Sequence, residues 1–405
     1  EKLGKGKAFF DIEATEHSPD HSRIAWSADT RGSEYFTIRI REAGKERDRR
    51  EQITDTDGSI VWSADSNALY YVRMDENHRP YRVYRHRLGT SIDKDELVFE
   101  EKNPRWFIHL SQTQSGRFGE IEVADHETSE TRLIDLTQDA PKPRRVAERR
   151  ERVRFDVSDH DNALFILTNA DGAVDFKIVQ APLKSRSSDQ WRDLIPHKPG
   201  RLITGMTAFA RHLVRTERED GLPRIVIREI ASGDEHAIAF DEEAYDLDLG
   251  EVLEYDTDVL RFSYSSLTTP WETWDYNMKT RERTLRKRQE IPSGHDPKKY
   301  VTRRIYATSH DGTEVPISIL HARKTKIDGK APLFLNGYGS YGYSTDAGFR
   351  SNVFSLVDRG FVYAIAHIRG GTDKGWNWYL DGKLEKKTNT FHDFIACAKH
   401  LARRK

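Results

Sequence analysis

Cysteine is almost absent from this sequence, because Cys397 is the single one among 405 residues. One cysteine forms neither an internal disulfide nor a cysteine-built metal site, and its scarcity favours a reducing compartment, so we expect a cytoplasmic protein. Long hydrophobic runs are also missing, and none approaches the roughly 20 apolar residues that cross a bilayer. No signal peptide opens the chain at Glu1.

An excess of charge of one sign is lacking too. The 65 Lys and Arg residues face 66 Asp and Glu residues and leave a formal net charge of −1. Such a balance gives no electrostatic basis for binding nucleic acid or an anionic membrane, and we predict neither partner. The 16 histidines show no ligand spacing with carboxylates, so we predict neither a metal nor another cofactor.

What the sequence does contain, from residue 1 to about residue 290, is a loose repeat of turn, strand, turn and strand. The spacing is about 45–50 residues, which is typical of β-propeller blades. Six units are visible, beginning at His17, Ser59, Ser111, Ser158, Phe209 and Tyr255. We therefore predict an all-β propeller over 1–290 with about six blades, and a large β-sandwich is the alternative.

The pattern changes after a linker that extends from Gln289 to Tyr300. We expect strands from Val301 and Glu314, a buried strand PLFLN, and a helix over 351–359 that ends at Gly360. The strand FVYAIAH follows and is apolar on both faces, as a parallel strand covered by helices should be. This order predicts the N-terminal half of an α/β-hydrolase domain over 291–405.

The last helix is predicted to begin at Thr390, with Asp393 at the spacing of a capping box. Its buried stripe is predicted to consist of Phe391, Phe394, Ile395, Ala398 and Leu401. Cys397 lies beside that stripe and is interpreted as a small packed residue.

Two patterns imitate the turn that holds a hydrolase nucleophile. Asp373 lies in Gly-Thr-Asp-Lys-Gly, but a polar segment rather than a helix is expected after it, so we interpret the spacing as a coincidence. No G-x-S-x-G occurs in the 405 residues, and Ser340 is interpreted as a loop residue. His367 ends a buried strand and is interpreted as a hydrogen-bonded structural residue rather than a catalytic base. Arg369 is expected to anchor carboxylates or carbonyls and to shape its loop.

The segment NGYGSYGY, residues 336–343, carries glycines that alternate with tyrosines. In α/β-hydrolases the loop after the third strand supplies half of the oxyanion hole. Glycine lets the backbone approach a substrate, and a tyrosine hydroxyl can donate to a developing oxyanion. A surface loop without a role is the alternative, and the pattern alone leaves both open.

The sequence resembles the oligopeptidase B branch of the prolyl oligopeptidase family of serine peptidases. Four long segments carry the resemblance, namely RGFVYAIAHIRGG, DGKLEKKTNTF, NGYGSYG and GSIVWSAD. The resemblance implies a seven-bladed propeller and an α/β-hydrolase domain, cleavage of short peptides after Arg or Lys, and a Ser-His-Asp triad. We expect a monomer that acts on short peptides with basic residues.

The resemblance also implies roles for single residues. Tyr338 matches the tyrosine that donates to the oxyanion, and Asp346 matches the first aspartate of a pair that binds a basic substrate residue. We also predict that Arg369 contributes to substrate binding. Two positions depart from the pattern, Asn336 where the family usually has Tyr and Gly348 where it often has a second Asp.

The family's triad has no match in the 405 residues, so we expect its members after Lys405 and expect the first blade to be missing or incomplete. The sequence as written is then predicted to be inactive. Two alternatives stay open. One is a relative that cleaves after proline, and the other is a non-catalytic propeller used as a binding scaffold.

Overall fold

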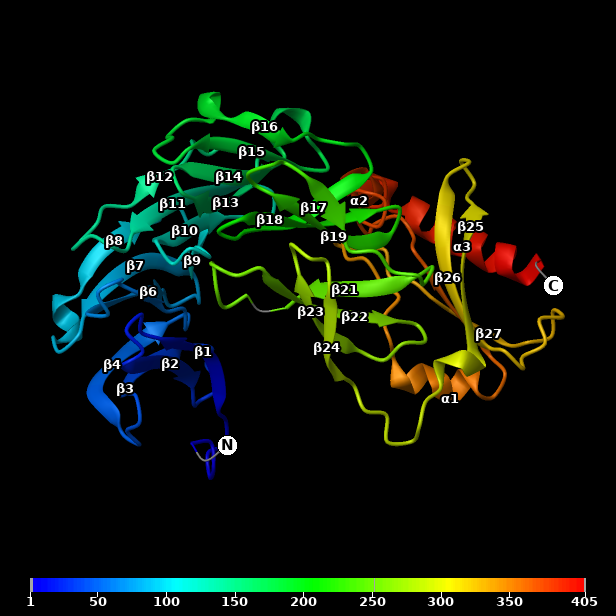
Figure 1. Ribbon diagram of the computed structural model, residues 1–405, viewed down its shortest axis with the longest axis horizontal. Helices are drawn as coiled ribbons and strands as arrows, with labels where there is room; N and C mark the ends of the chain where they lie inside the picture. The colour runs from blue at the N-terminus through cyan, green and yellow to red at the C-terminus, as the bar shows by residue number, and fades with distance from the viewer. Residues whose placement is uncertain (1–2, 251, 404–405) are drawn as a thin grey trace. The chain divides into compact units, whose positions relative to one another are not determined.

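The structure is a computed structural model that describes residues 3–250 and 252–403. The predicted last residue of the hydrolase segment, Lys405, lies outside the described residues. Within them, the strands form six sheets, of which the first has eight strands and the others have four each. Figure 1 labels the elements along the chain.

The first sheet contains two four-stranded units, β1 to β4 and β5 to β8, whose adjoining strands β4 and β6 pair at Thr56 and Arg73. Its strands are β1 (Asp11–His17), β2 (Arg23–Asp29), β3 (Phe36–Glu42), β4 (Asp48–Thr56), β5 (Val61–Trp62), β6 (Ala68–Met74), β7 (Pro80–Arg87) and β8 (Glu96–Glu100).

In each of the next four sheets, consecutive strands are neighbours. The second sheet contains β9 (Phe107–Gln112), β10 (Phe118–Ala124), β11 (Ser129–Asp135) and β12 (Arg144–Arg145). The third contains β13 (Phe155–His160), β14 (Ala163–Thr168), β15 (Lys177–Pro182) and β16 (Arg192–Ile195). The fourth contains β17 (Arg201–Ala208), β18 (His212–Glu219), β19 (Leu222–Glu229) and β20 (Glu235–Ala237). The fifth contains β21 (Tyr245–Leu249), β22 (Val259–Ser266), β23 (Glu272–Asn277) and β24 (Arg283–Arg288). Strands β1 to β24 thus form six four-stranded units, as the repeat predicts.

The chain divides into two compact units. The first is Glu1–Ala170 with Val179–Asp193, and the second is Asp171–Ile178 with Leu194–Lys405. The second unit therefore groups sheets β17–β20 and β21–β24 with the C-terminal sheet. The domain boundary near residue 290 stays a prediction.

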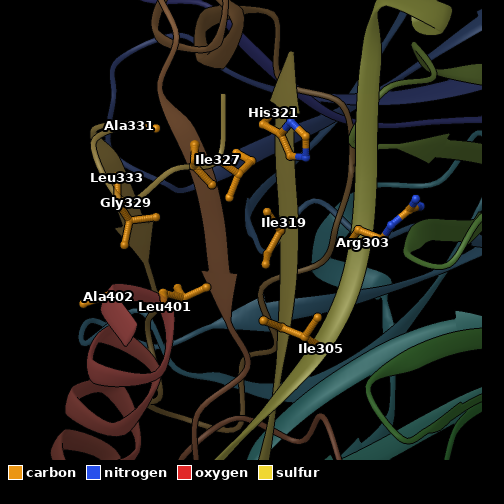
Figure 2. A pocket seen from close by; sticks show the side chains of 11 residues that line it. Arg303, Ile305, Ile319, His321, Ile327, Gly329, Ala331, Leu333, Leu401 and Ala402 are labelled. Atoms are coloured by element: carbon orange, nitrogen blue, oxygen red, sulfur yellow. The ribbon is translucent and has the colours of Figure 1, made fainter. Parts of the chain in front are cut away.

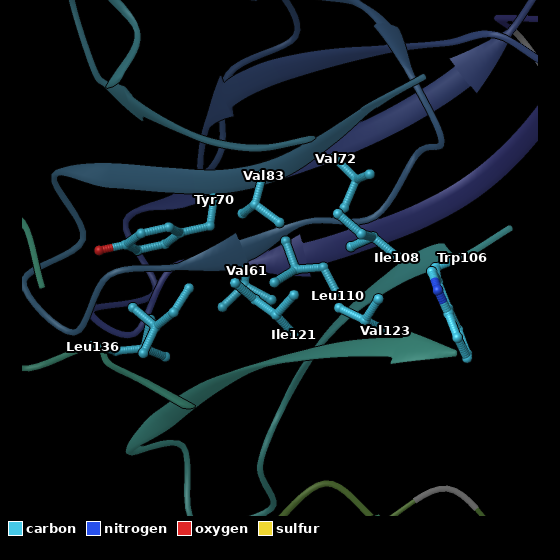
Figure 3. Close-up of a cluster of buried hydrophobic side chains, with 11 residues drawn as sticks. Val61, Tyr70, Val72, Val83, Trp106, Ile108, Leu110, Ile121, Val123 and Leu136 are labelled. Carbon is cyan, nitrogen blue, oxygen red and sulfur yellow. The ribbon is translucent and has the colours of Figure 1, made fainter. Parts of the chain in front are cut away.

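In the first unit, neighbouring sheets share an apolar core. Figure 3 shows one cluster, in which Val72 and Val83 of the first sheet gather with Leu110 and Ile121 of the second. All four side chains are buried. Each contributes about 1.5–3 kcal/mol by leaving water, a gain that one four-stranded sheet cannot reach alone.

The C-terminal sheet has the strand order β25-β26-β28-β27, in which β27 runs parallel to β28 and the other pairs are antiparallel. Its strands are β25 (Tyr300–Thr308), β26 (Glu314–Ala322), β27 (Leu333–Asn336) and β28 (Val362–Ala366). Three α-helices accompany them in the described residues, namely α1 (Phe354–Val357), α2 (Trp376–Leu380) and α3 (Thr388–Arg403).

Helices cover both faces of β28, as its apolar run predicts. Tyr363 and Ile365 lie in a core with Phe354 of α1. Ala364 and Ala366 point the other way, into a core that contains Cys397 of α3. The alternation follows from the two-residue period of a strand. Cys397 is fully buried, and burial raises the pKa of its thiol, so it is the packed residue that the sequence predicts.

The prediction for the last helix is wrong in its start and in part of its buried stripe. The helix begins at Thr388, and the side chains of Thr390 and Asp393 bind the loop at Arg369 instead of forming a capping box. Phe391 and Ile395, predicted to be buried, are 60% and 47% exposed. The polar contacts with that loop fix the rotation of α3, and they turn these two side chains outward.

Two further predictions for this region are wrong. The segment after Asp373 is not a continuous polar loop, because α2 begins at Trp376. The strand β27 is not buried, because it lies at the end of the sheet with Leu333 and Phe334 38% and 48% exposed.

Candidate active site

The carboxyl ends of the parallel strands β27 and β28 carry the two loops that the sequence singles out. Gly339 and Gly370 lie in these loops, and Gly382 follows α2. A Cβ atom on Gly370 would lie 2.0 Å from the carbonyl oxygen of Gly339, and one on Gly382 would lie 2.2 Å from the nitrogen of Gly370. Only glycine lets backbones cross this closely, so the three segments hold one another in place.

Tyr338 lies between two packed glycines. A Cβ atom on Gly337 would lie 3.2 Å from the carbonyl oxygen of Ala366, and one on Gly339 would lie 2.8 Å from that of Arg369. The Tyr338 side chain is 52% exposed, and its ring meets that of Tyr343 edge-on with 5.8 Å between the centroids. A tightly packed backbone therefore carries an accessible phenol hydroxyl, which is what a hydrogen-bond donor to a substrate requires.

The start of α3 anchors both loops. Thr390 donates from Oγ1 to the carbonyl oxygen of Arg369 at 2.7 Å. Lys387 donates from Nζ to the carbonyl oxygen of Gly339 and to Oγ of Ser340, the latter at 2.7 Å. Burial lowers the pKa of Lys387. The sequence gives no signal for either anchor, because nothing in the local pattern links Thr390 to a residue 21 positions earlier or Lys387 to residues 47 and 48 positions earlier.

Arg369 is buried, with 4% of its surface exposed, and is bound by carboxylates. It donates from Nε and Nη2 to Asp393 at 2.8 and 2.6 Å, and from Nη1 to Asp311 at 2.6 Å. The hydrogen bonds with Asp393 raise the pKa of Arg369, and the bond from Arg369 holds the pKa of Asp311 well below its usual range. This geometry gives Arg369 its loop-shaping role. Protein carboxylates bind all three guanidinium nitrogens, and the predicted contact of Arg369 with substrate stays a prediction.

His367 and Asp373 form a buried pair. His367 Nδ1 is hydrogen-bonded to Asp373 Oδ1 at 3.0 Å, and its Nε2 is hydrogen-bonded to Ser318 Oγ at 2.8 Å. The three residues repeat the order of a catalytic triad, but Ser318 is fully buried and the other two are 3% and 2% exposed. No substrate reaches a hydroxyl in that position, so the arrangement is structural. The interpretations of His367 as a structural residue and of the Asp373 spacing as a coincidence agree with it.

Asp346 is paired with an arginine from a distant part of the chain. Arg218 of β18 donates from Nη1 and Nη2 to the two oxygens of Asp346, at 2.6 and 3.0 Å. Burial opposes the charge of Arg218, but Asp346 more than compensates and raises the pKa of the guanidinium. A cationic substrate group at Asp346 would have to share or displace this partner. The sequence gives no signal for a pair that is 128 positions apart.

The departure at Gly348 has a steric explanation. A Cβ atom at this position would lie 2.8 Å from Oδ2 of Asp246 and 3.1 Å from Oγ of Ser265. Asp246 comes from β21 and already occupies the space that a side chain at position 348 would enter. Burial, followed by repulsion from Asp346 and Asp248, raises the pKa of Asp246 to about 7.

An apolar groove of about 600 Å³ lies elsewhere on the C-terminal sheet. Figure 2 shows Ile305 and Ile319 facing Leu333 and Leu401 across it. None of the predicted site residues lines this groove. Its lining has few polar groups that could orient a reacting molecule, so it does not carry the candidate chemistry.

The described residues contain no group of three or more His, Cys, Asp or Glu side chains that could hold a metal ion. Among the helices in this part of the chain, none combines the length and the apolar character that crossing a bilayer requires.

Replacing Gly370 by alanine is expected to lower the free energy of unfolding by about 2–3 kcal/mol, because the new methyl group would overlap the Gly339 carbonyl. Gly360→Ala is the matched control. Both glycines have positive φ, 103° and 94°, but a Cβ at Gly360 meets nothing within 4 Å. The control should lose only about 1 kcal/mol. Equal losses in urea unfolding would show that the backbone crossing contributes nothing.

Comparisons with known proteins agree with this fold. Residues 1–289 match the family model "Prolyl oligopeptidase, N-terminal beta-propeller domain", and residues 347–405 match the model "Prolyl oligopeptidase family". The first sheets are therefore blades of a propeller, and the C-terminal sheet is part of an α/β-hydrolase domain, as the sequence predicts.

Single relatives match over almost the whole chain. Dipeptidyl aminopeptidase BI of Pseudoxanthomonas mexicana is 38% identical over 99% of this chain and 55% of its own length. Protease 2 of Moraxella lacunata is 32% identical over 99% of this chain and 58% of its own length. Among solved structures, oligopeptidase B from Leishmania major matches with a TM-score of 0.91. Its sequence is 33% identical, and the match covers 99% of this chain and 58% of that one. This chain thus spans a little more than half the length of the relatives it matches, and it belongs to the prolyl oligopeptidase family.

Proposed function

We propose that this chain is part of a serine peptidase that hydrolyses short peptides on the carboxyl side of Arg or Lys. The observation that carries the proposal is the accessible hydroxyl of Tyr338 on a loop whose backbone is fixed by Gly339 and Gly370. A donor held in advance stabilises the oxyanion of acyl transfer without reorganising during the reaction. The proposal includes a monomeric, cytoplasmic enzyme without a cofactor.

In this proposal the attacking serine and its histidine and aspartate lie outside the 405 residues. No G-x-S-x-G occurs within them, and the one Ser-His-Asp arrangement described above, around His367, is buried. The 405 residues supply the propeller and the Tyr338 loop. Without a nucleophile and a base they form no acyl-enzyme, so we propose that they are inactive by themselves.

Asp346 is proposed to bind the basic group of the substrate. Its carboxylate is partly exposed and is held by Arg218, and Asp246 is close to the same loop. Arg218 donates to both oxygens of Asp346, and Asp246 adds a second carboxylate, so the cluster has net negative charge where Asp246 is ionised, which favours a cation.

A second candidate function is the release of dipeptides from the amino terminus of a peptide. The name of the 38% identical relative favours it. The two candidates share the acyl-transfer chemistry and differ in whether the substrate needs a free α-amino group.

The test is labelling and turnover by the full-length protein. A fluorophosphonate is expected to label one serine, and an arginyl amide with a blocked amino terminus is expected to be hydrolysed. Turnover of the unblocked dipeptide alone would favour the second candidate, and turnover of a prolyl amide alone would favour cleavage after proline. Absence of both labelling and turnover would contradict a peptidase and favour a binding scaffold.

A further inference from the structure

We infer that Lys387 is a positioning residue for the reaction: its ammonium group fixes the loop that presents the Tyr338 hydroxyl. The inference rests on the proposed function, because it takes Tyr338 as the oxyanion donor. It adds a residue to which neither the sequence pattern nor the relatives' names assign a role.

Glycine lies on both sides of Tyr338 and allows the adjoining backbone a wide range of conformations. Its side chain is half exposed, and the ring contact with Tyr343 does not restrain the hydroxyl oxygen. The direction of the hydroxyl therefore depends on how firmly the backbone from Gly337 to Ser340 is held.

Packing holds both glycines of this short segment, and a left-handed turn follows at its second end. Gly337 lies against Phe394, where a Cβ atom would be 3.1 Å from the ring. At the other end, Gly339 has a φ of 66° and Tyr341 has a φ of 56°, which is an uncommon conformation for a residue with a side chain. A left-handed turn of this kind persists only where its surroundings impose it.

Lys387 adds a polar restraint to this packing. Its Nζ donates both to the carbonyl oxygen of Gly339 and to Oγ of Ser340, the two residues that follow Tyr338. It is partly buried, and burial lowers its pKa. The two hydrogen bonds from this ammonium group offset part of the cost of its burial, and they restrain the loop that accepts them.

The neighbouring lysine shows the contrast. Lys386 is 62% exposed in its side chain, and its Nζ lies 2.7 Å from Oδ1 of Asp381. That is an ordinary surface ion pair, which contributes little to stability. The two adjacent lysines thus form a matched pair, of which only Lys387 reaches the Tyr338 loop.

The experiment measures kcat and KM of the full-length protein with an arginyl amide. Tyr338→Phe is expected to lower kcat about 100-fold by removing the donor. Lys387→Met is expected to lower kcat about 10- to 100-fold with little change in KM, because a donor displaced by about 1 Å loses most of its effect. Lys387→Arg should recover most of the activity, and Lys386→Met should match the wild type.

The double variant Lys387→Met with Tyr338→Phe separates positioning from a general loss of structure. If Lys387 acts through Tyr338, the double variant is no slower than Tyr338→Phe alone. Losses that multiply would overturn the inference, and so would wild-type kcat in Lys387→Met. Both outcomes differ from failure of the proposed function, in which the wild type itself shows neither labelling nor turnover.

Discussion

Replacing Arg369 by methionine is expected to lower the free energy of unfolding of the second unit by about 3–5 kcal/mol. The guanidinium neutralises Asp393, which is fully buried, and it also binds Asp311. Methionine fills similar space but leaves a buried carboxylate without a counter-charge. Ser309 donates to Asp393 as well, at 2.6 Å, but one hydroxyl does not replace a charged partner that makes two hydrogen bonds.

The control for this prediction is Arg303→Met. Arg303 is 62% exposed in its side chain and lies 3.6 Å from Glu243, so its loss should cost less than about 1 kcal/mol. A second variant, Arg369→Met with Asp393→Asn, removes the stranded charge and should recover part of the stability. Urea unfolding followed by tryptophan fluorescence measures all three. If Arg369→Met is no less stable than Arg303→Met, the buried network does not hold the loop.

Much of the fold follows from local sequence signals. The turns and strands of the repeat predict six four-stranded units, and the apolar run of β28 predicts a strand covered on both faces. Gly360 has a φ of 94° in the turn after α1, but α1 itself ends at Val357 with Asp358 as its C-cap, so the predicted helix over 351–359 is too long. Each of the correctly predicted features depends on residues within one or two elements, so the period of the sequence is enough to find it.

The parts of the site that the sequence did not predict depend on contacts between distant residues. The orientation of α3 is set by polar contacts of Thr390 and Asp393 with the loop at Arg369, and an amphipathic pattern cannot include them. A prediction from the amphipathic pattern considers only apolar side chains. It therefore places Phe391 and Ile395 in the buried stripe and assigns Thr390 and Asp393 to a capping box. Such a prediction assumes that the buried face of a helix is apolar, and the buried polar face of α3 breaks this assumption.

The same limit explains Gly348. From the sequence alone, Gly348 means only that the second aspartate of the family's pair is absent. In the structure, the space belongs to Asp246, which comes from a strand a hundred residues earlier. Strand β21 and the loop that carries Asp346 therefore bring carboxylates to one place from different parts of the chain, and only the tertiary structure shows that they are neighbours.

Asp246→Asn is expected to stabilise the protein above pH 7 and to leave its stability nearly unchanged at pH 4. Burial and the nearby Asp346 and Asp248 raise the pKa of Asp246 to about 7, while Arg218 only partly offsets them. In the unfolded chain an aspartate has a pKa of about 3.9. Between these values the folded state keeps a proton that the unfolded state releases, so the stability of the wild type falls as the pH rises from 4 to 7.

The size of the effect follows from the two pKa values. Each pH unit in this window is worth at most about 1.4 kcal/mol, so the wild type loses up to about 4 kcal/mol that the asparagine variant keeps. Asparagine has nearly the same shape and cannot ionise, which isolates the charge. Asp256→Asn is the control, because Asp256 is 75% exposed and pairs with Arg211 at the surface.

The measurement is the difference in the free energy of unfolding between each variant and the wild type, at pH 4, 5.5, 7 and 8. Taking differences removes the contribution of every other titrating group that the mutation leaves unchanged. A difference that grows with pH for Asp246→Asn and stays flat for Asp256→Asn is the expected result. If the Asp246→Asn difference stays flat as well, Asp246 is ionised with its charge compensated, and Arg218 must then serve both carboxylates rather than Asp346 alone.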